Sequence, residues 1–233
     1  MQNSPVVISL GGSLIVPDEI DSVFLKNFKN VIIKKIEQGF KFIIIAGGGK
    51  ISRKYVDAAR QVTDITKDDQ DWLGIHTTRL NAHLIRTIFR DYSYPVITDN
   101  PNTPEKIEDY LLNNSLMVAA GYRPGNSTDY IATLLAVRFN CNLIINLSNI
   151  DYAYDKDPNK NSDAKKLVNI NWSDFIKVVG NVWEPGLNTP FDPVASKVSK
   201  ENKLKVIIAN GRDFENLENI LANKPYKGTT IQD

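Results

Sequence analysis

The sequence lacks the features that mark secreted, membrane-bound and nucleic-acid-binding proteins. Its single cysteine, Cys141, cannot form an internal disulfide, which favours a reducing compartment. No apolar run approaches the roughly 18 residues that a membrane span needs, and no basic segment precedes the first apolar stretch. The 28 lysines and arginines nearly balance the 27 aspartates and glutamates, so no charge excess indicates a polyanionic partner. We therefore expect a cytoplasmic protein that is neither secreted nor anchored and binds neither nucleic acid nor membranes.

Histidine is also scarce, and its placement argues against a metal site built from side chains. His76 and His83 lie seven residues apart in an expected helix, with no cysteine or carboxylate cluster beside them. We expect surface or core positions for both and predict no metal ligands from the protein. Trp72 and Trp183 are expected to pack against other side chains rather than to stack on a base.

Short apolar runs rich in β-branched residues alternate with longer segments of helical periodicity. This alternation predicts an α/β fold with a largely parallel central sheet and helices on both faces. The expected strands are residues 6–10, 42–46, 95–98, 116–120, 143–146 and 206–209, and the expected helices are 24–36, 71–89 and 129–139. Residues 151–192 are rich in Asp, Asn and Pro, so we expect loops and small elements of a second lobe there.

Three glycine-containing loops follow expected strands. They are Gly11-Gly12-Ser13, Gly47-Gly48-Gly49-Lys50 and the run from Gly121 to Asp129. Glycine lets backbone N–H groups gather around an anion, and a following helix adds its positive end. One such loop could be only a tight turn, but three at the same edge of a sheet suit an enzyme that holds a donor and an acceptor phosphate together.

The common nucleotide-binding motifs do not account for these loops. Lys50 is followed by Ile51, where a Walker loop requires Ser or Thr, so the chain is not a P-loop NTPase. The sequence has no H-R-D, D-F-G or G-x-G-x-x-G motif, which excludes protein kinases and dinucleotide dehydrogenases.

The motifs and their order resemble the amino-acid-kinase superfamily, in particular its archaeal-type UMP kinases. The motifs are VISLGGS (7–13), GGGKISRKY (47–55), DWLGI (71–75), PGNSTD (124–129), SNIDYAYDKDP (148–158), NTPFDP (188–193) and GTTI (228–231). The resemblance extends from end to end and implies one amino-acid-kinase-type domain over residues 1–233. It implies an acceptor lobe for UMP over about 1–135 and an ATP lobe over about 136–233.

The same resemblance implies an activity and its participants. The reaction would transfer the γ-phosphoryl group of ATP to UMP and give UDP, with Mg²⁺ accompanying the ATP. The chain would form a homo-oligomer, and the family implies a hexamer. Two alternatives stay open: a kinase of the same scaffold for another small phosphate or carboxylate acceptor, or a non-catalytic relative that binds a nucleotide or an oxyanion.

Site residues follow from the resemblance by position. For ATP it implies Gly12, Ser13, Gly49, Arg53, Ser148, Tyr154 and Asp157. For UMP it implies Gly48, Asp71, Gly121, Tyr122, Arg123, Pro124, Gly125, Asn126 and Ser127. Arg53 and Lys50 are the cations nearest in sequence to an expected phosphate-binding loop. We therefore predict that they stabilise the negative charge of the transferred phosphoryl group in the transition state. A solvated helix face is the alternative for both residues, and a helix N-cap is the alternative for Asp71.

Three positions depart from the superfamily pattern and bear on the ATP side. Ser9 stands where many members have a lysine, although archaeal-type UMP kinases resemble this chain in that respect. Tyr152 replaces a glycine, and residues 181–185 match no pattern of the family.

Overall fold

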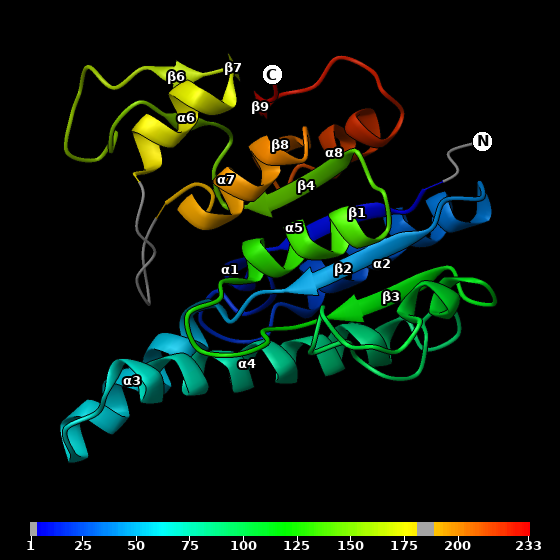
Figure 1. The fold of residues 1–233 in the computed structure, drawn as a ribbon, viewed down its shortest axis with the longest axis horizontal. Coiled ribbons are helices and arrows are strands. Elements are labelled where there is room, and N and C mark those ends of the chain that lie inside the picture. The colour runs from blue at the N-terminus through cyan, green and yellow to red at the C-terminus, as the bar shows by residue number, and fades with distance from the viewer. Residues whose placement is uncertain (1–3, 181–188) are drawn as a thin grey trace.

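The computed structural model describes residues 4–180 and 189–233. Within them, seven strands form one sheet in the order β3-β2-β1-β4-β8-β9-β7 (Figure 1). Neighbouring strands are parallel except β8 and β9, which are antiparallel. The strands are β1 (Val6–Leu10), β2 (Phe42–Ala46), β3 (Leu116–Ala119), β4 (Leu143–Ser148), β7 (Asn169–Ile170), β8 (Lys205–Asn210) and β9 (Thr229–Ile231). The predicted largely parallel sheet is confirmed.

Helices cover both faces of the sheet, as the sequence predicts. They are α1 (Gly12–Ile15), α2 (Ser22–Glu37), α3 (Gly49–Val62), α4 (Lys67–Ile88), α5 (Thr128–Arg138), α6 (Trp172–Val179), α7 (Pro193–Glu201) and α8 (Phe214–Leu221), with a short 3-10 helix, η1, at Ile107–Leu111. Helices α2, α4 and α8 pack on one face, and α5, α6 and α7 pack on the other. None of these helices combines the length and the apolar composition that a membrane span requires.

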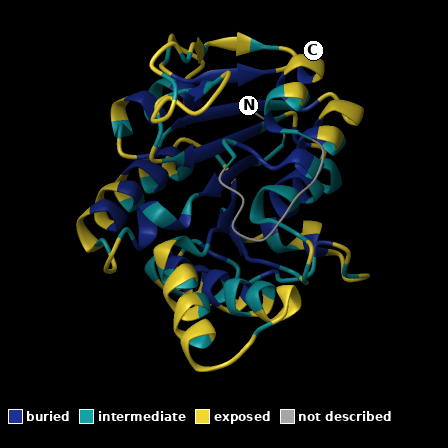
Figure 2. Ribbon diagram, turned by 90° about the vertical axis from the view of Figure 1, so that its left-hand side faces the viewer, coloured by how far each residue is buried: buried dark blue, intermediate teal, exposed yellow. Residues whose placement is uncertain are grey.

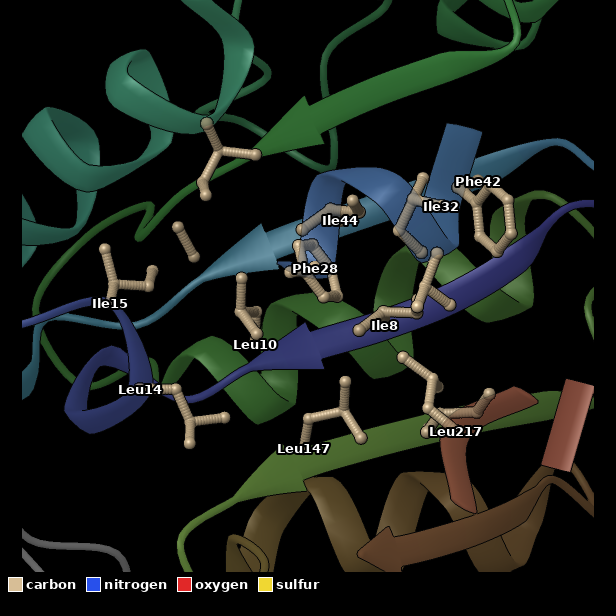
Figure 3. Packing of buried hydrophobic residues seen from close by; sticks show 14 of the residues in the cluster. Ile8, Leu10, Leu14, Ile15, Phe28, Ile32, Phe42, Ile44, Leu147 and Leu217 are labelled. Atoms are coloured by element: carbon tan, nitrogen blue, oxygen red, sulfur yellow. The ribbon is translucent and has the colours of Figure 1, made fainter. Parts of the chain in front are cut away.

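The two faces have separate hydrophobic cores because side chains alternate along each strand. On β1, Ile8 and Leu10 join the core under α2, whereas Val7 joins the core under α5. Figure 3 shows Ile8 and Leu10 beside Phe28 and Ile32 of α2. The buried residues, dark blue in Figure 2, run through the central strands. Burial on both faces explains why these strands are continuous apolar runs in the sequence.

Helix α4 begins earlier than the sequence analysis expects. Thr66 is its N-cap, and the Thr66 and Asp69 side chains form a reciprocal capping box. The expected start at Asp71 is therefore wrong, because Asp71 lies in the second turn of the helix. An N-cap role for Asp71 is excluded by the same geometry.

The expected strand at 95–98 is also wrong. Only two isolated bridges, Ser93 to Leu116 and Thr98 to Ala119, connect this segment to β3. Pro95 has no N–H to donate to a ladder, and Val96 is 59% exposed. The segment therefore flanks the edge of the sheet without forming a strand of its own.

Residues 151–180 contain small elements, as the sequence predicts. A two-stranded sheet pairs β5 (Ala153–Tyr154) with β6 (Lys166–Leu167), and β7 and α6 follow it. Trp183 and the 181–185 departure lie outside the described residues. Trp72 is 42% exposed beside His76, so it does not belong to either core.

Candidate active site

Three glycine-containing loops meet at the carboxyl edge of the parallel strands, as expected for an α/β sheet. They follow β1, β2 and β3, and they line one cleft of about 610 Å³. The remaining walls come from α3, α4, the end of β4, the start of α5, and Thr189 and Pro190 ahead of α7. The cleft therefore gathers backbone groups from segments that are far apart in the sequence.

The first two glycine loops touch each other through their backbones. A Cβ on Gly12 would lie 2.0 Å from the nitrogen of Gly49 and 2.5 Å from the carbonyl carbon of Gly48. Gly49 has a φ of +70°, and a Cβ there would lie 2.3 Å from the oxygen of Gly12. Only glycine allows this approach, so the two loops form one continuous surface of backbone groups. Such a surface suits phosphate oxygens.

Helix α4 fixes the second and third loops with polar side chains on one face. Asn81 Nδ2 donates to the Gly47 oxygen at 2.8 Å. Thr78 Oγ1 accepts the N–H of Gly121 at 2.8 Å, and Asp71 Oδ2 accepts the N–H of Gly125 at 2.7 Å. Because all three side chains belong to one rigid helix, the spacing between the loops is set by α4.

Asp71 lines this cleft as a partly buried carboxylate. Burial raises its pKa, the hydrogen bond from Gly125 acts in the opposite direction, and the nearby charge of Asp68 raises the pKa further. Its Oδ2 is engaged by Gly125, and the carboxylate lines the cleft. A carboxylate placed in this way can accept hydrogen bonds from hydroxyl groups and repels phosphate.

Two further carboxylates, for which the sequence analysis predicted no role, are Asp129, which is partly buried and lines the cleft, and Asp192, which is buried. Asp129 Oδ1 accepts from Ser9 Oγ at 2.9 Å and from Asn146 Nδ2 at 3.0 Å. Burial raises the pKa of Asp129 to about 7, the Ser9 hydrogen bond opposes this shift, and the charge of Asp192 adds to it. Asp192 caps α7, and its Oδ2 is buried with no hydrogen-bond partner among the described residues. Burial raises its pKa as well.

A signal for this carboxylate pair was present in the sequence. Ser9 and Asn146 are polar residues inside the otherwise apolar strands β1 and β4. A polar residue on a strand that is buried on both faces requires a polar partner. Asp129, at the start of the helix that follows the third loop, is that partner for both residues.

The structure places ten of the predicted site residues on the walls of the cleft. They are Gly12, Ser13, Gly48, Gly49, Arg53, Asp71, Gly121, Asn126, Ser127 and Ser148. Arg53 makes no hydrogen bond or ion pair with any other described residue, so its guanidinium has no competing partner among them.

The other predicted site residues do not line the cleft. They are Lys50, Tyr122, Arg123, Pro124, Gly125, Tyr154 and Asp157. Lys50 Nζ lies 3.0 Å from Asp18 Oδ1 in an exposed ion pair. Asp157 accepts the N–H of Asn159 at 2.9 Å within its own loop. The roles of these residues stay predictions.

Residues 4–210 match the sequence profile of the amino acid kinase family. The chain belongs to this family. It is 35% identical over 233 residues to a uridylate kinase from Thermoplasma volcanium, covering 99% of each chain. It is 30% identical over 228 residues to a uridylate kinase from Thermococcus kodakarensis, covering 97% of this chain and 99% of the other.

Solved structures agree with the membership in the amino acid kinase family. The uridylate kinase from Archaeoglobus fulgidus has a TM-score of 0.82 at 27% identity, over 97% of this chain and 99% of that one. The UMP kinase from Bacillus anthracis has a TM-score of 0.78 at 22% identity, over 99% of this chain and 96% of that one. At this identity the similarity shows a shared fold alone.

The geometry of the cleft suits a phosphoryl transfer in which the protein mainly positions the two phosphates. Such transfer requires the attacking and leaving oxygens to lie in line with the transferred phosphorus, and it requires cations or amides that stabilise the negative charge of the phosphoryl group. It needs little covalent chemistry from the protein. The joined glycine loops provide backbone amides, and Arg53 provides a cation. Among the described residues no group of three or more His, Cys, Asp or Glu side chains could hold a metal ion.

Proposed function

We propose that this chain transfers the γ-phosphoryl group of ATP to UMP and releases UDP and ADP. The observation that carries the proposal is the backbone contact between Gly12 and the Gly48-Gly49 pair at the floor of one cleft. That contact brings two phosphate-binding loops together in a chain whose full length aligns with proteins named uridylate kinase.

The donor and the acceptor take different parts of the cleft in this proposal. ATP lies toward residues 136–233 and meets Gly12, Ser13 and Ser148. UMP lies toward residues 1–135 and meets Gly48, Asp71 and the loop 121–127. The support is that Asp71, which suits ribose hydroxyls, lies on α4, whereas Ser148 ends β4 across the cleft.

The reaction forms one P–O bond and breaks another. A phosphate oxygen of UMP attacks the γ-phosphorus, and the bond from that phosphorus to the bridging oxygen of ADP breaks. A phosphate monoester is largely dianionic at pH 7, so no protein base is required to remove a proton from UMP. Arg53 is the proposed cation for the equatorial oxygens, because its guanidinium has no protein partner among the described residues.

We propose that Mg²⁺ enters with ATP. Mg²⁺ often keeps several waters and binds through substrate phosphates with one or two carboxylates. Asp129 and the unpartnered Oδ2 of Asp192 fit that limited contribution, because a nearby cation would offset the desolvation cost of the two carboxylates. The bound ion would supply charge neutralisation at the phosphates.

We also propose a homo-oligomer in which α3 meets a second copy of the chain. Helix α3 packs against α4 and α1, yet none of its residues is buried. Ile51, Tyr55, Ala58 and Val62 form an apolar stripe along it, and Tyr55 and Val62 are 52% and 86% exposed. Lys54 lies in the second turn of α3 and Asp64 lies just beyond its end, so an antiparallel pair of copies can bring opposite charges together.

The acceptor is tested by an ADP-release assay with Mg-ATP across UMP, CMP, dUMP, AMP and isopentenyl phosphate. We expect UMP to give the highest kcat/KM, because Asp71 gains hydrogen bonds from a ribose and gains nothing from an apolar acceptor. Turnover of isopentenyl phosphate without turnover of UMP would contradict the proposal and support another acceptor. Binding of ATP without turnover of any acceptor would instead support a non-catalytic relative.

A further inference from the structure

Arg79 on α4 holds the start of the 121–127 loop, although its side chain does not line the cleft. Its Nε donates to the Gly121 oxygen at 3.3 Å, and its Nη2 donates to the Tyr122 oxygen at 3.1 Å. The same Nη2 lies 3.2 Å from Asp99 Oδ2, and the Arg79 side chain is 25% exposed. The rigid fork of a guanidinium suits two acceptors at fixed positions, and a lysine cannot reproduce it.

This contact fixes the orientation of two successive peptide planes. The described residues contain no cis peptide bond, so each N–H points away from the carbonyl that precedes it in the same plane. The N–H groups of Tyr122 and Arg123 are therefore turned away from Arg79. Neither donates to a protein acceptor within the described residues, so both can donate to a ligand.

Two further contacts with α4 anchor the same loop. Thr78 accepts the N–H of Gly121, which lines the cleft, and Asp71 accepts the N–H of Gly125. Arg79 acts on the carbonyl side of Gly121 while Thr78 acts on its N–H side. Both backbone polar groups of Gly121 are therefore held by side chains of α4. The path of residues 122–124 depends on the Arg79 contacts.

We infer that Arg79 is a positioning residue for the acceptor nucleotide, an inference that rests on the proposed function. It sets the place of Gly121 in the cleft and the path of the loop from Tyr122 to Asn126, whose Asn126 end lines the cleft where the nucleoside monophosphate would bind. Arg79 touches neither the donor loops nor Arg53. Its removal therefore acts on UMP and leaves ATP binding unchanged.

Asp99 holds the Arg79 guanidinium through an ion pair. It directly follows Thr98, which pairs with Ala119 at the end of β3, so its carboxylate lies beside the start of the loop. Its side chain is 48% exposed. Because exposed ion pairs contribute little, Asp99→Asn should change the KM for UMP by about fivefold at most.

The test uses the full chain and three variants in steady-state kinetics. Arg79→Met keeps the length of the side chain and removes the donors, and we expect a KM for UMP about 10- to 100-fold higher with an unchanged KM for ATP. Arg79→Lys keeps the charge but not the fork, and we expect an intermediate rise of about 2- to 10-fold. Arg90→Met, beyond the end of α4 and 75% exposed, is the matched control and should behave like the parent.

Hydrogen exchange supplies a measurement that does not depend on turnover. UMP should protect the amides of residues 121–127 in the parent, and Arg79→Met should lose most of that protection at matched occupancy. An Arg79→Met protein with the parent's KM for UMP and the parent's protection would overturn the inference while the proposed function stands. A parent that turns over no UMP would overturn both. Should Arg79→Met fail to fold, a parent-like KM for UMP in Arg79→Lys would equally overturn the inference.

Discussion

Asp129 shows how a single partly buried carboxylate can make stability depend on pH. In the native chain its pKa is raised to about 7, whereas its ordinary value is 3.8. Between these values the native state binds the proton and the unfolded chain has released it. The contribution of Asp129 to stability should therefore fall as pH rises from 4 to 7, and it should level off above 7.

Asp129→Asn removes this titration and keeps an acceptor for Ser9 and Asn146. We expect the variant to gain stability relative to the parent between pH 5 and pH 8, by about 2 to 3 kcal/mol. Urea unfolding of both proteins at the two pH values measures the difference. Asp192 titrates in both proteins, so its contribution cancels in the comparison. Equal pH dependence in parent and variant would mean that Asp129 is ionised throughout.

Asp71 can be tested without disturbing the start of α4, because Thr66 and Asp69 form the cap. Asp71→Ala should raise the KM for UMP by about 10- to 100-fold, since hydrogen bonds to a charged group contribute roughly 1.5 to 3 kcal/mol. Asp71→Asn keeps an oxygen for the N–H of Gly125 and should raise this KM by a smaller factor. The KM for ATP should not change in either variant.

Asp69→Ala is the matched control for Asp71. It breaks the capping box two residues away and should lower the melting temperature while the KM for UMP stays at the parent's value. If Asp71→Ala lowers only the melting temperature in the same way, Asp71 has a structural role alone and the nucleotide acceptor loses its main support.

At the level of elements, the contact between the first two glycine loops is rigid because both sides are backbone. A Cβ on Gly12 meets Gly49 and Gly48 main-chain atoms at 2.0 and 2.5 Å, so one loop must move. Gly12→Ala should lower stability by about 1–3 kcal/mol and reduce kcat/KM for ATP by on the order of 100-fold. Chemical unfolding and kinetics at saturating UMP measure the two effects.

Gly39→Ala is the control for Gly12→Ala, because it introduces backbone strain at a glycine that does not take part in the contact between the two loops. Gly39 also has a positive φ, +89°, but a Cβ there meets nothing within 4 Å. This control should lose some stability and keep full activity. Equal kinetics for the Gly12 and Gly39 variants would mean that the loop contact does not shape the ATP site.

The elements that the sequence predicts best are those with strong local signals. The expected strands 6–10 and 42–46 coincide with β1 and β2, because both are short, mainly apolar runs followed by glycine. The expected strand at 95–98 failed because Pro95 interrupts hydrogen bonding. Strand β9 was missed because its three residues pair with β8 and β7, which are distant in the sequence.

The same distinction applies to the candidate site. The glycine loops could be predicted, because a strand followed by glycine and a helix is a local pattern. The roles of Asp129 and Arg79 could not be predicted locally. Their partners, Ser9 and Asn146 for one and the Gly121 and Tyr122 carbonyls for the other, are brought near only by the folded sheet.

At the scale of the whole molecule, the exposed α3 makes the assembly state testable. Figure 1 shows α3 and the start of α4 extending away from the sheet, on the side opposite β6 and β7. Residues at the centre of an interface commonly contribute 2 kcal/mol or more, so Val62→Asp should weaken self-association by about tenfold or more. Sedimentation velocity over a range of protein concentrations measures the change.

Val168→Asp is the control for this experiment, because Val168 is also exposed, at 47%, but lies between β6 and β7. It should associate like the parent. Opposite charges at the two ends of α3 should make the association weaker in 1 M salt, where screening reduces the attraction between Lys54 and Asp64 of two copies. A parent that sediments as a 26.2 kDa monomer at all concentrations would contradict the proposed oligomer. A Val168→Asp protein that dissociates while Val62→Asp does not would move the interface from α3 to the opposite end of the molecule.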